Sequence, residues 1–184
     1  MAITIYTIGH GNRSSSEFRD LLREADVRDL IDVRAHPGSR RHPQFSRSTL
    51  DADLSASGIH YTWAGEALGG RRRPRTDSRN VAWRNDSFRA YADHMESPQF
   101  VAAIEELMQL AEKERPAIMC AERLPWQCHR YLISDFLVMR GLEVMHLIAP
   151  GSARPHMLNP IARVEGGTLV YDRTSQMDLG LGDS

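Results

Sequence analysis

The sequence predicts an α/β fold, a three-layer sandwich in which a mostly parallel sheet of about five strands has helices on both faces. Short β-prone apolar runs alternate along the chain with segments whose apolar residues follow the helical spacing. Strands joined through helices pair in parallel by right-handed crossovers, which distributes the helices over the two faces. The 184 residues, 41% of them hydrophobic, are enough for one full core. We therefore expect a single domain over residues 1–174 and a flexible polar tail over residues 175–184.

Three strands are predicted in the first third of the chain. Residues 3–8 are β-prone, and a Gly-His-Gly break separates them from a serine-capped segment with helical spacing. The apolar run at 30–33 is the second strand, and a loop rich in Pro, Gly and Arg follows it. Ser48 resembles the start of a capping box for a helix that ends at Gly58, and residues 59–63 form the third strand.

The middle of the chain combines a long loop with two helices. Residues 65–84 are rich in Gly and Arg and have little hydrophobic periodicity, which is typical of a functional or disordered loop. A helix is expected over 88–95. A stronger one begins at Pro98, and its apolar residues share one face up to Ala111.

The last third continues the strand and helix alternation. Residues 116–120 read as a buried strand, and a seven-residue loop leads to an amphipathic helix that ends at Gly141. Residues 143–148 form the fifth strand. A hairpin is expected over 161–171, around a Gly-Gly turn.

Charge and composition restrict the class of protein. The net charge is −1, but residues 34–84 hold ten Arg against four acidic residues, so a local basic region lies on an otherwise acidic molecule. Such a region suits an anionic small molecule, and nucleic acid is an alternative partner. Two cysteines are too few for a disulfide framework, and no apolar run could cross a bilayer. We expect a cytoplasmic protein without membrane contact, and the sequence does not set its oligomeric state.

The residues with the clearest chemistry follow the fourth strand, where Cys120 is separated by seven residues from Cys128, His129 and Arg130. In a parallel sheet, ligands bind beyond the carboxyl ends of the strands, where His10 and Arg34 are expected too. A thiol at a helix N-terminus near a cation has a lowered pKa, which favours Cys128 over Cys120 as the thiolate. Arg34, Arg40 and Arg130, with free N–H groups of the first helical turn, are candidate anion contacts.

Structural roles, or a metal site, are alternatives for the same residues. Either cysteine can be a small buried hydrophobic residue, and Arg130 can pair with a nearby acid. Zinc is a further alternative, with Cys120, Cys128, His129 and His10 as ligands, but the paired spacing that structural zinc sites use is absent. We therefore expect neither a metal nor a cofactor.

Several motifs together carry a family resemblance. They are Thr7-Ile8-Gly9-His10, Asp32-Val33-Arg34 with Pro37 and Ser39-Arg40, Leu68-Gly69-Gly70, and Met119-Cys120-Ala121-Glu122 through Cys128-His129-Arg130. In this order the chain resembles the domain of unknown function 488 family from Ile5 to about Ile148. The resemblance adds Glu122 to Cys120, Cys128 and His129 as candidate catalytic residues. It also adds Gly69 and Gly70 to His10, Arg34, Arg40 and Arg130 as candidate substrate-binding residues.

A fainter likeness is to rhodanese-type sulfurtransferases, in which an Asp-Val-Arg strand precedes a later strand that ends in Cys. It implies that Cys120 would carry sulfur. The seven-residue loop here lacks the compact Gly and Arg pattern of that family and ends in a second Cys, so the likeness extends to the fold only.

Three functional hypotheses remain open from the sequence. The first is a thiol-dependent hydrolase or transferase that acts on a phosphate-bearing or other anionic substrate. The second is a non-catalytic module that binds nucleic acid or another anion. The third is a structural zinc protein. Rhodanese-like sulfur transfer is a further alternative.

Overall fold

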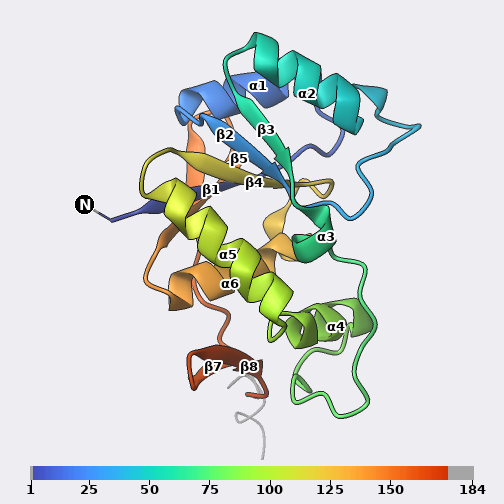
Figure 1. The fold of residues 1–184 in the computed structure, drawn as a ribbon, viewed down its shortest axis with the longest axis vertical. Helices are drawn as coiled ribbons and strands as arrows, with labels where there is room; N and C mark the ends of the chain where they lie inside the picture. The colour runs from blue at the N-terminus through green and yellow to red at the C-terminus, as the bar shows by residue number, and fades with distance from the viewer. Residues whose placement is uncertain (1, 174–184) are drawn as a thin grey trace, which may run out of the picture.

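The computed structural model describes residues 2–173, which form a six-stranded sheet, a small two-stranded sheet and the helices around them (Figure 1). The strand order is β3-β2-β4-β1-β5-β6, and all pairs are parallel except β5 with β6. The strands are β1 Thr4–Gly9, β2 Asp29–Asp32, β3 His60–Trp63, β4 Pro116–Cys120, β5 Glu143–Ala149 and β6 Ser152–Pro155. The predicted mostly parallel sheet is confirmed.

Helices cover both faces of this sheet, as a three-layer sandwich requires (Figure 1). Helices α1 Ser15–Glu24 and α2 Arg47–Ala56 pack on one face through a hydrophobic cluster that includes Phe18 and Leu54. Helices α5 Pro98–Ala111 and α6 Arg130–Met139 pack on the other through a cluster that includes Phe100 and Phe136. The remaining elements are α3 Gly65–Leu68, α4 Asp86–His94, β7 Ala162–Glu165 and β8 Thr168–Tyr171.

Local sequence signals explain where most elements begin and end. Ser14 and Glu17 form the reciprocal capping box of α1: Ser14 Oγ accepts from Glu17 N at 3.1 Å, and the Glu17 carboxylate accepts from Ser14 N at 2.7 Å. Ser97 caps α5 directly before Pro98, which supplies no N–H that would need a partner. The expected hairpin is confirmed as β7 and β8, joined at Gly166 and Gly167, which both have positive φ.

Two expectations were wrong in detail. Helix α2 begins at Arg47, and its N-cap is Ser46 and not Ser48, because the 3-10 turn η1 (Pro43–Phe45) already directs the chain into the helix. Strand β6 was not expected at all. It is an edge strand with exposed side chains that pairs only with β5, so it has neither an apolar run nor a clear alternation.

The topology creates a crevice at the carboxyl ends of the central strands. β1 and β4 are neighbours, but the segment after β1 leads to α1 on one face and the segment after β4 leads to α6 on the other. In open α/β sheets, ligands bind where consecutive connections diverge in this way. The candidate site is therefore expected beyond Gly9 and Cys120, which are partners in the sheet.

Two further expectations concern the whole chain. In the part of the chain that the structure describes, no helix is long and apolar enough to cross a membrane. The tail expected over residues 175–184 lies outside the described residues, so the division into one domain and a tail stays a prediction.

Candidate active site

Three side chains meet where β4 ends and α6 begins. Cys120 is the last residue of β4, and Cys128 and His129 directly precede α6. Their two Sγ atoms and a His129 ring nitrogen all lie within 4.8 Å of one another, and Cys120 Sγ is 3.9 Å from His129 Nδ1. His129 Nε2 is 2.9 Å from the carbonyl oxygen of Val33, which can only accept. Nε2 therefore carries a proton, and Nδ1 is the atom that faces the thiol.

The two cysteines have opposite acidities. The pKa of the Cys120 thiol lies well below its usual range, first because Cys128 donates a hydrogen bond to its sulfur, and further because His129 and Arg130 are close. Burial raises the pKa of Cys128 well above its usual range, and the neighbouring Cys120 sulfur raises it further. These opposite shifts favour Cys120 over Cys128 as the thiolate.

The surroundings of Cys128 do not support the predicted preference for it as the thiolate. Cys128 lies before the helix in extended backbone, and its sulfur is buried. The free helical N–H groups expected as anion contacts are already bonded within the chain. Arg130 N donates to Cys128 Sγ, Tyr131 N to Cys128 O, and Leu132 N and Ile133 N to His129 O. The first N–H groups of α6 therefore already have acceptors in Cys128 and His129.

A pocket of about 290 Å³ opens over the cluster. Its lining includes Cys120, Cys128 and His129, with Arg34 from the segment after β2, Arg71 from the long loop, and the start of α4. A larger hollow of about 620 Å³ lies at the opposite, amino-terminal edge of the sheet, but no Cys or His lines it. The pocket over Cys120 is therefore the better candidate for chemistry.

Arg34 is held rigidly at the wall of this pocket. Its Nε and Nη2 atoms donate to the two carboxylate oxygens of Asp32 at 2.9 and 2.6 Å, and Tyr61 OH donates to Asp32 at 2.6 Å. Trp63 Nε1 donates to the backbone oxygen of Arg34 at 2.9 Å. Both charged partners are buried, so Arg34 lines the pocket as half of a fixed ion pair.

Arg130 lies beneath the site and does not line the pocket. Only 1% of its surface is exposed, and its Nη2 donates to the carbonyl oxygens of Glu122 at 2.6 Å and Arg123 at 2.9 Å. Its Nη1 donates to Thr7 Oγ1 at 3.2 Å. Arg130 therefore holds the loop between β4 and α6 against the sheet.

Gly9 permits this close approach. A Cβ at Gly9 would lie 1.8 Å from the carbonyl oxygen of Glu122 and 2.7 Å from Arg130 Nη2. Any larger residue would displace the loop that Arg130 holds.

The Gly69-Gly70 turn packs against the cluster of Cys120, Cys128 and His129. A Cβ at Gly70 would lie 2.5 Å from His129 Nδ1, so only glycine leaves the imidazole in place. Tyr91 of α4 supports the turn: its hydroxyl donates to the Leu68 oxygen at 2.8 Å, and its ring lies 4.9 Å from the His129 ring. The structure thus brings Gly70 to the site through contact with His129.

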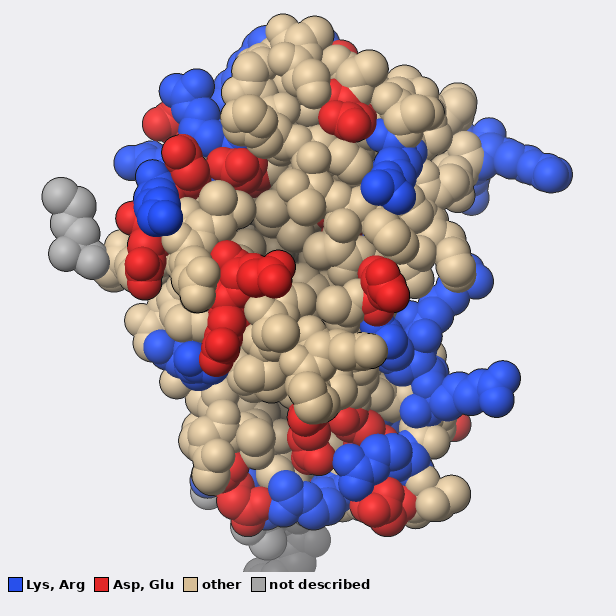
Figure 2. All heavy atoms as spheres, in the orientation of Figure 1, with Lys and Arg blue, Asp and Glu red and all other residues tan. Residues whose placement is uncertain are grey.

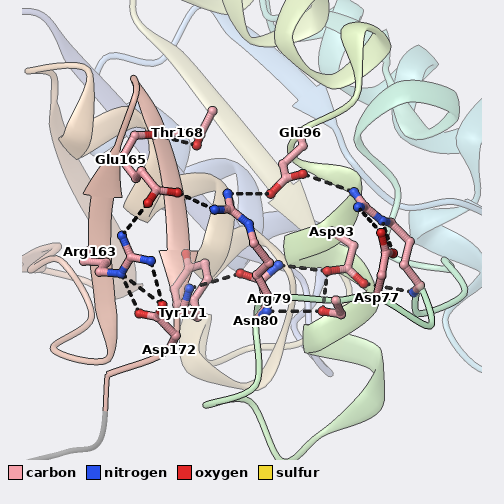
Figure 3. Close-up of polar contacts among 12 residues, drawn as sticks. Asp77, Arg79, Asn80, Asp93, Glu96, Arg163, Glu165, Thr168, Tyr171 and Asp172 are labelled. Carbon is pink, nitrogen blue, oxygen red and sulfur yellow. Dashed lines mark hydrogen bonds and ion pairs between the residues drawn. The ribbon is translucent and has the colours of Figure 1, made fainter.

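The Arg-rich loop after this turn is anchored by acidic residues. Basic side chains protrude along the side of the molecule where the loop between α3 and α4 runs (Figure 2), and those of the loop are all Arg. Asp93 of α4 accepts from Arg75 N at 3.0 Å, Ser78 Oγ at 2.5 Å and Asn80 Nδ2 at 2.8 Å. Arg79 pairs with Glu165 of β7 (Figure 3).

Further ion pairs continue from this loop across the hairpin of β7 and β8. Glu96 pairs with Arg75 and Arg79, and Arg163 pairs with Glu165 and Asp172 (Figure 3). These contacts fix the path of the loop from the hairpin to α4. They also pair two arginines of the loop, Arg75 and Arg79, with acidic side chains, so the basic tract is not a continuous cationic surface.

Of the other candidate residues, His10 and Arg40 lie apart from the pocket and Glu122 lines it. The His10 ring stacks on Phe45 at 4.5 Å, and its Nδ1 is 2.9 Å from the Gly11 oxygen. Arg40 is exposed in the loop before η1 and does not line the pocket. Glu122 does line it, with an exposed side chain.

Arg71 is a charged pocket residue that the sequence pointed to only as one member of an Arg run that could clamp a polyanion. It follows Gly70, is exposed and lines the pocket. The signal was present in the Arg run, but five similar arginines between 71 and 79 gave no means of choosing one.

The cluster has the donor set of a metal centre. Two thiolates and an imidazole are ligands that zinc accepts, and the His129 bond to the Val33 oxygen would orient the ring for this purpose. His10 does not join the three, and among residues 2–173 no fourth ligand completes a closed structural site. The expected four-ligand zinc alternative is therefore not assembled.

Comparison with known proteins gives a family and no function. A family model described as domain of unknown function DUF488 matches residues 14–137, well over half of the chain. Searches of curated proteins and of solved structures found no match. The matched residues include Arg34, the Gly69-Gly70 turn and the whole Cys120 to Arg130 segment, and the family assignment made from those motifs is confirmed. The chain belongs to the DUF488 family.

Proposed function

We propose that this protein is a thiol-dependent hydrolase or transferase in which the Cys120 thiolate attacks a small anionic substrate. The observation that carries the proposal is the pairing of a Cys120 sulfur, lowered in pKa by the Cys128 hydrogen bond, with His129 at the base of a pocket. A thiolate available near neutral pH is the nucleophilic form of cysteine.

Each site residue has a role in this proposal. Cys120 gives its proton to His129 Nδ1, and its sulfur forms a bond to the electrophilic atom of the substrate. The leaving group takes the proton back from His129 Nδ1, and water or a second substrate then releases the transferred group from sulfur. Cys128 remains a thiol whose S–H stabilises the Cys120 thiolate.

An anion fits the rest of the pocket. Arg71 is the exposed arginine of the lining, and Arg34 contributes a fixed ion pair at the wall. Nucleic acid is less well supported, because Arg75, Arg79 and Arg163 are already paired with acidic side chains. A pocket of about 290 Å³ suits a small molecule.

The test compares two alkylating agents that differ in charge. Iodoacetate is anionic and iodoacetamide is neutral, so their rate ratio at Cys120, relative to free glutathione, reports the attraction of the site for anions. We expect the ratio to exceed that of glutathione and to fall in Arg71→Gln. Arg73→Gln is the matched control, since Arg73 belongs to the same run but does not line this pocket. A ratio equal to that of glutathione would contradict anion recognition.

A shared metal ion is the competing account of the same three atoms. It would occupy the Cys120 sulfur and protect both cysteines from alkylation. Elemental analysis of the purified protein, with alkylation before and after chelation, separates the two accounts: stoichiometric metal with chelator-dependent alkylation contradicts the free thiolate.

A further inference from the structure

A second group of polar side chains lies buried behind the active site, away from the pocket. Asp135 of α6, His156 after β6, His146 of β5 and Thr7 of β1 are each at most 6% exposed. They come from four separate elements and line up between the sheet and α6. The role proposed above for Cys120 makes no use of them.

Short contacts join these residues in series. His156 Nε2 is 2.8 Å from Asp135 Oδ1, and His146 Nε2 is 2.9 Å from His156 Nδ1. His146 Nδ1 is 2.7 Å from Thr7 Oγ1, which in turn accepts from Arg130 Nη1 at 3.2 Å. The series therefore begins at a buried carboxylate and ends at the guanidinium that holds the active-site loop.

One assignment of hydrogens uses every donor in the series. Asp135 accepts from Tyr171 OH and Asn159 N as well, so it is an acceptor throughout and His156 Nε2 must donate. His156 Nδ1 then accepts from His146 Nε2–H, and His146 Nδ1 accepts from the Thr7 hydroxyl. If the hydrogen bonds between His156 and His146 and between His146 and Thr7 ran in the opposite direction, the buried Thr7 hydroxyl hydrogen would have no acceptor among these partners, which is costly. Both histidines are thus neutral Nε2–H tautomers.

Charge supports the same assignment. Burial, the neighbouring His156 and the Arg130 cation lower the pKa of His146 to about 3, so it is neutral near pH 7. Tyr131 packs its ring against both imidazoles and adds no charge near neutral pH. The arrangement has one fixed anion end and one fixed cation end.

We propose that Asp135, His156, His146 and Thr7 are positioning residues that fix the Arg130 guanidinium and, through it, the Cys120 site. Among residues 2–173, Thr7 supplies the one side-chain acceptor of Arg130, and the two histidines orient the Thr7 lone pair toward it. Arg130 then aims Nη2 at the Glu122 and Arg123 oxygens, which places the loop between Cys120 and Cys128. This inference rests on the proposed thiolate function and names the residues that maintain it.

Thr7→Val tests the proposal because it keeps the shape of the side chain and removes both hydrogen bonds. We expect the pKa of Cys120, read from the pH profile of its alkylation, to rise in Thr7→Val and to return in Thr7→Ser. Tyr171→Phe is the matched control, since it removes a donor from the same Asp135 but lies outside the path to Arg130. An unchanged Cys120 profile in Thr7→Val, or an equal change in Tyr171→Phe, would overturn the proposal.

A second readout separates this proposal from the proposed function. The ¹⁵N shifts of the histidine rings report tautomers directly, and we expect Nε2–H for both His146 and His156 at pH 7. A Nδ1–H form of His146 would overturn the series whatever Cys120 does. If wild-type Cys120 has an ordinary thiol pKa, the proposed thiolate function fails. The positioning role is then tested alone, by the effect of Thr7→Val on the NMR resonances of the histidine rings and of the Arg130 side chain. Unchanged Arg130 resonances would overturn the positioning role.

Discussion

Cys120 Sγ lies 3.9 Å from His129 Nδ1, and the other ring nitrogen of His129 is fixed on the carbonyl oxygen of Val33. The residue that ends β4 is thereby coupled to the segment that follows β2, although His129 and Val33 are 96 positions apart in the sequence. A histidine held in this way presents one nitrogen to one thiol.

Cys128→Ala removes the S–H group that stabilises the Cys120 thiolate. We expect the pKa of Cys120 to rise, and each unit of rise lowers the thiolate fraction at a pH below the pKa about tenfold. Cys128→Ser keeps a hydroxyl donor and should retain most of the wild-type reactivity. Equal reactivity of Cys120 in wild type and Cys128→Ala, measured by iodoacetamide labelling at pH 7, would show that Cys128 has no such role.

Gly70→Ala should push the His129 ring away from Cys120, because the new Cβ would lie 2.5 Å from Nδ1. Overpacking of this kind costs about 1–3 kcal/mol in the free energy of unfolding. Labelling of Cys120 at neutral pH should slow as well. Gly38→Ala is the control, since a Cβ there meets nothing within 4 Å and its φ is not positive; similar effects of both substitutions would argue against the contact.

Asp93→Ala should release the Arg-rich loop. It leaves Arg75 N, Ser78 Oγ and Asn80 Nδ2 without their acceptor, which costs on the order of 2–4 kcal/mol in unfolding free energy. Urea denaturation measures this, and limited trypsin digestion should cut the loop faster. Arg79→Gln removes only surface ion pairs and should cost less than about 1 kcal/mol. A loop that stays resistant to trypsin in Asp93→Ala would contradict the anchoring role.

Stability should fall as the pH is lowered from about 6.5 toward 3, in part because of His146. Its pKa is about 3 in the folded protein and near 6.5 in the unfolded chain, so between these values the unfolded state binds the extra proton. This contribution reaches about 1.4 kcal/mol per pH unit, with stability rising as pH rises. His146→Gln should flatten the pH dependence of the unfolding free energy in this window, and an unaltered slope would mean that His146 is not buried in its neutral form.

The fold was largely predictable because strand runs and helical periodicity are local signals. The run Pro116–Cys120 was located to the residue, and so was the turn at Gly166-Gly167. Strand β6 was not predicted, because an exposed edge strand has no apolar pattern.

The candidate site was predictable as a set of residues but not as a geometry. Proximity of Cys120, Cys128 and His129 followed from their place after one strand. Which thiol ionises did not, because it depends on the direction of a hydrogen bond between two sulfurs and on backbone bonds of the first helical turn. Likewise, no local signal in the sequence shows that the Arg130 side chain is buried beneath the site while Arg71 lines the pocket.

The most direct test of the central claim is the pH dependence of alkylation at each cysteine, resolved by mass spectrometry on the native metal-free protein with a denatured control. The account predicts that Cys120 reacts with a pKa below that of the denatured control, while Cys128 stays unreactive to a higher pH than the control. Protection of Cys120 until the protein unfolds, or a Cys128 that ionises first, would contradict the claim that Cys120 is the nucleophile.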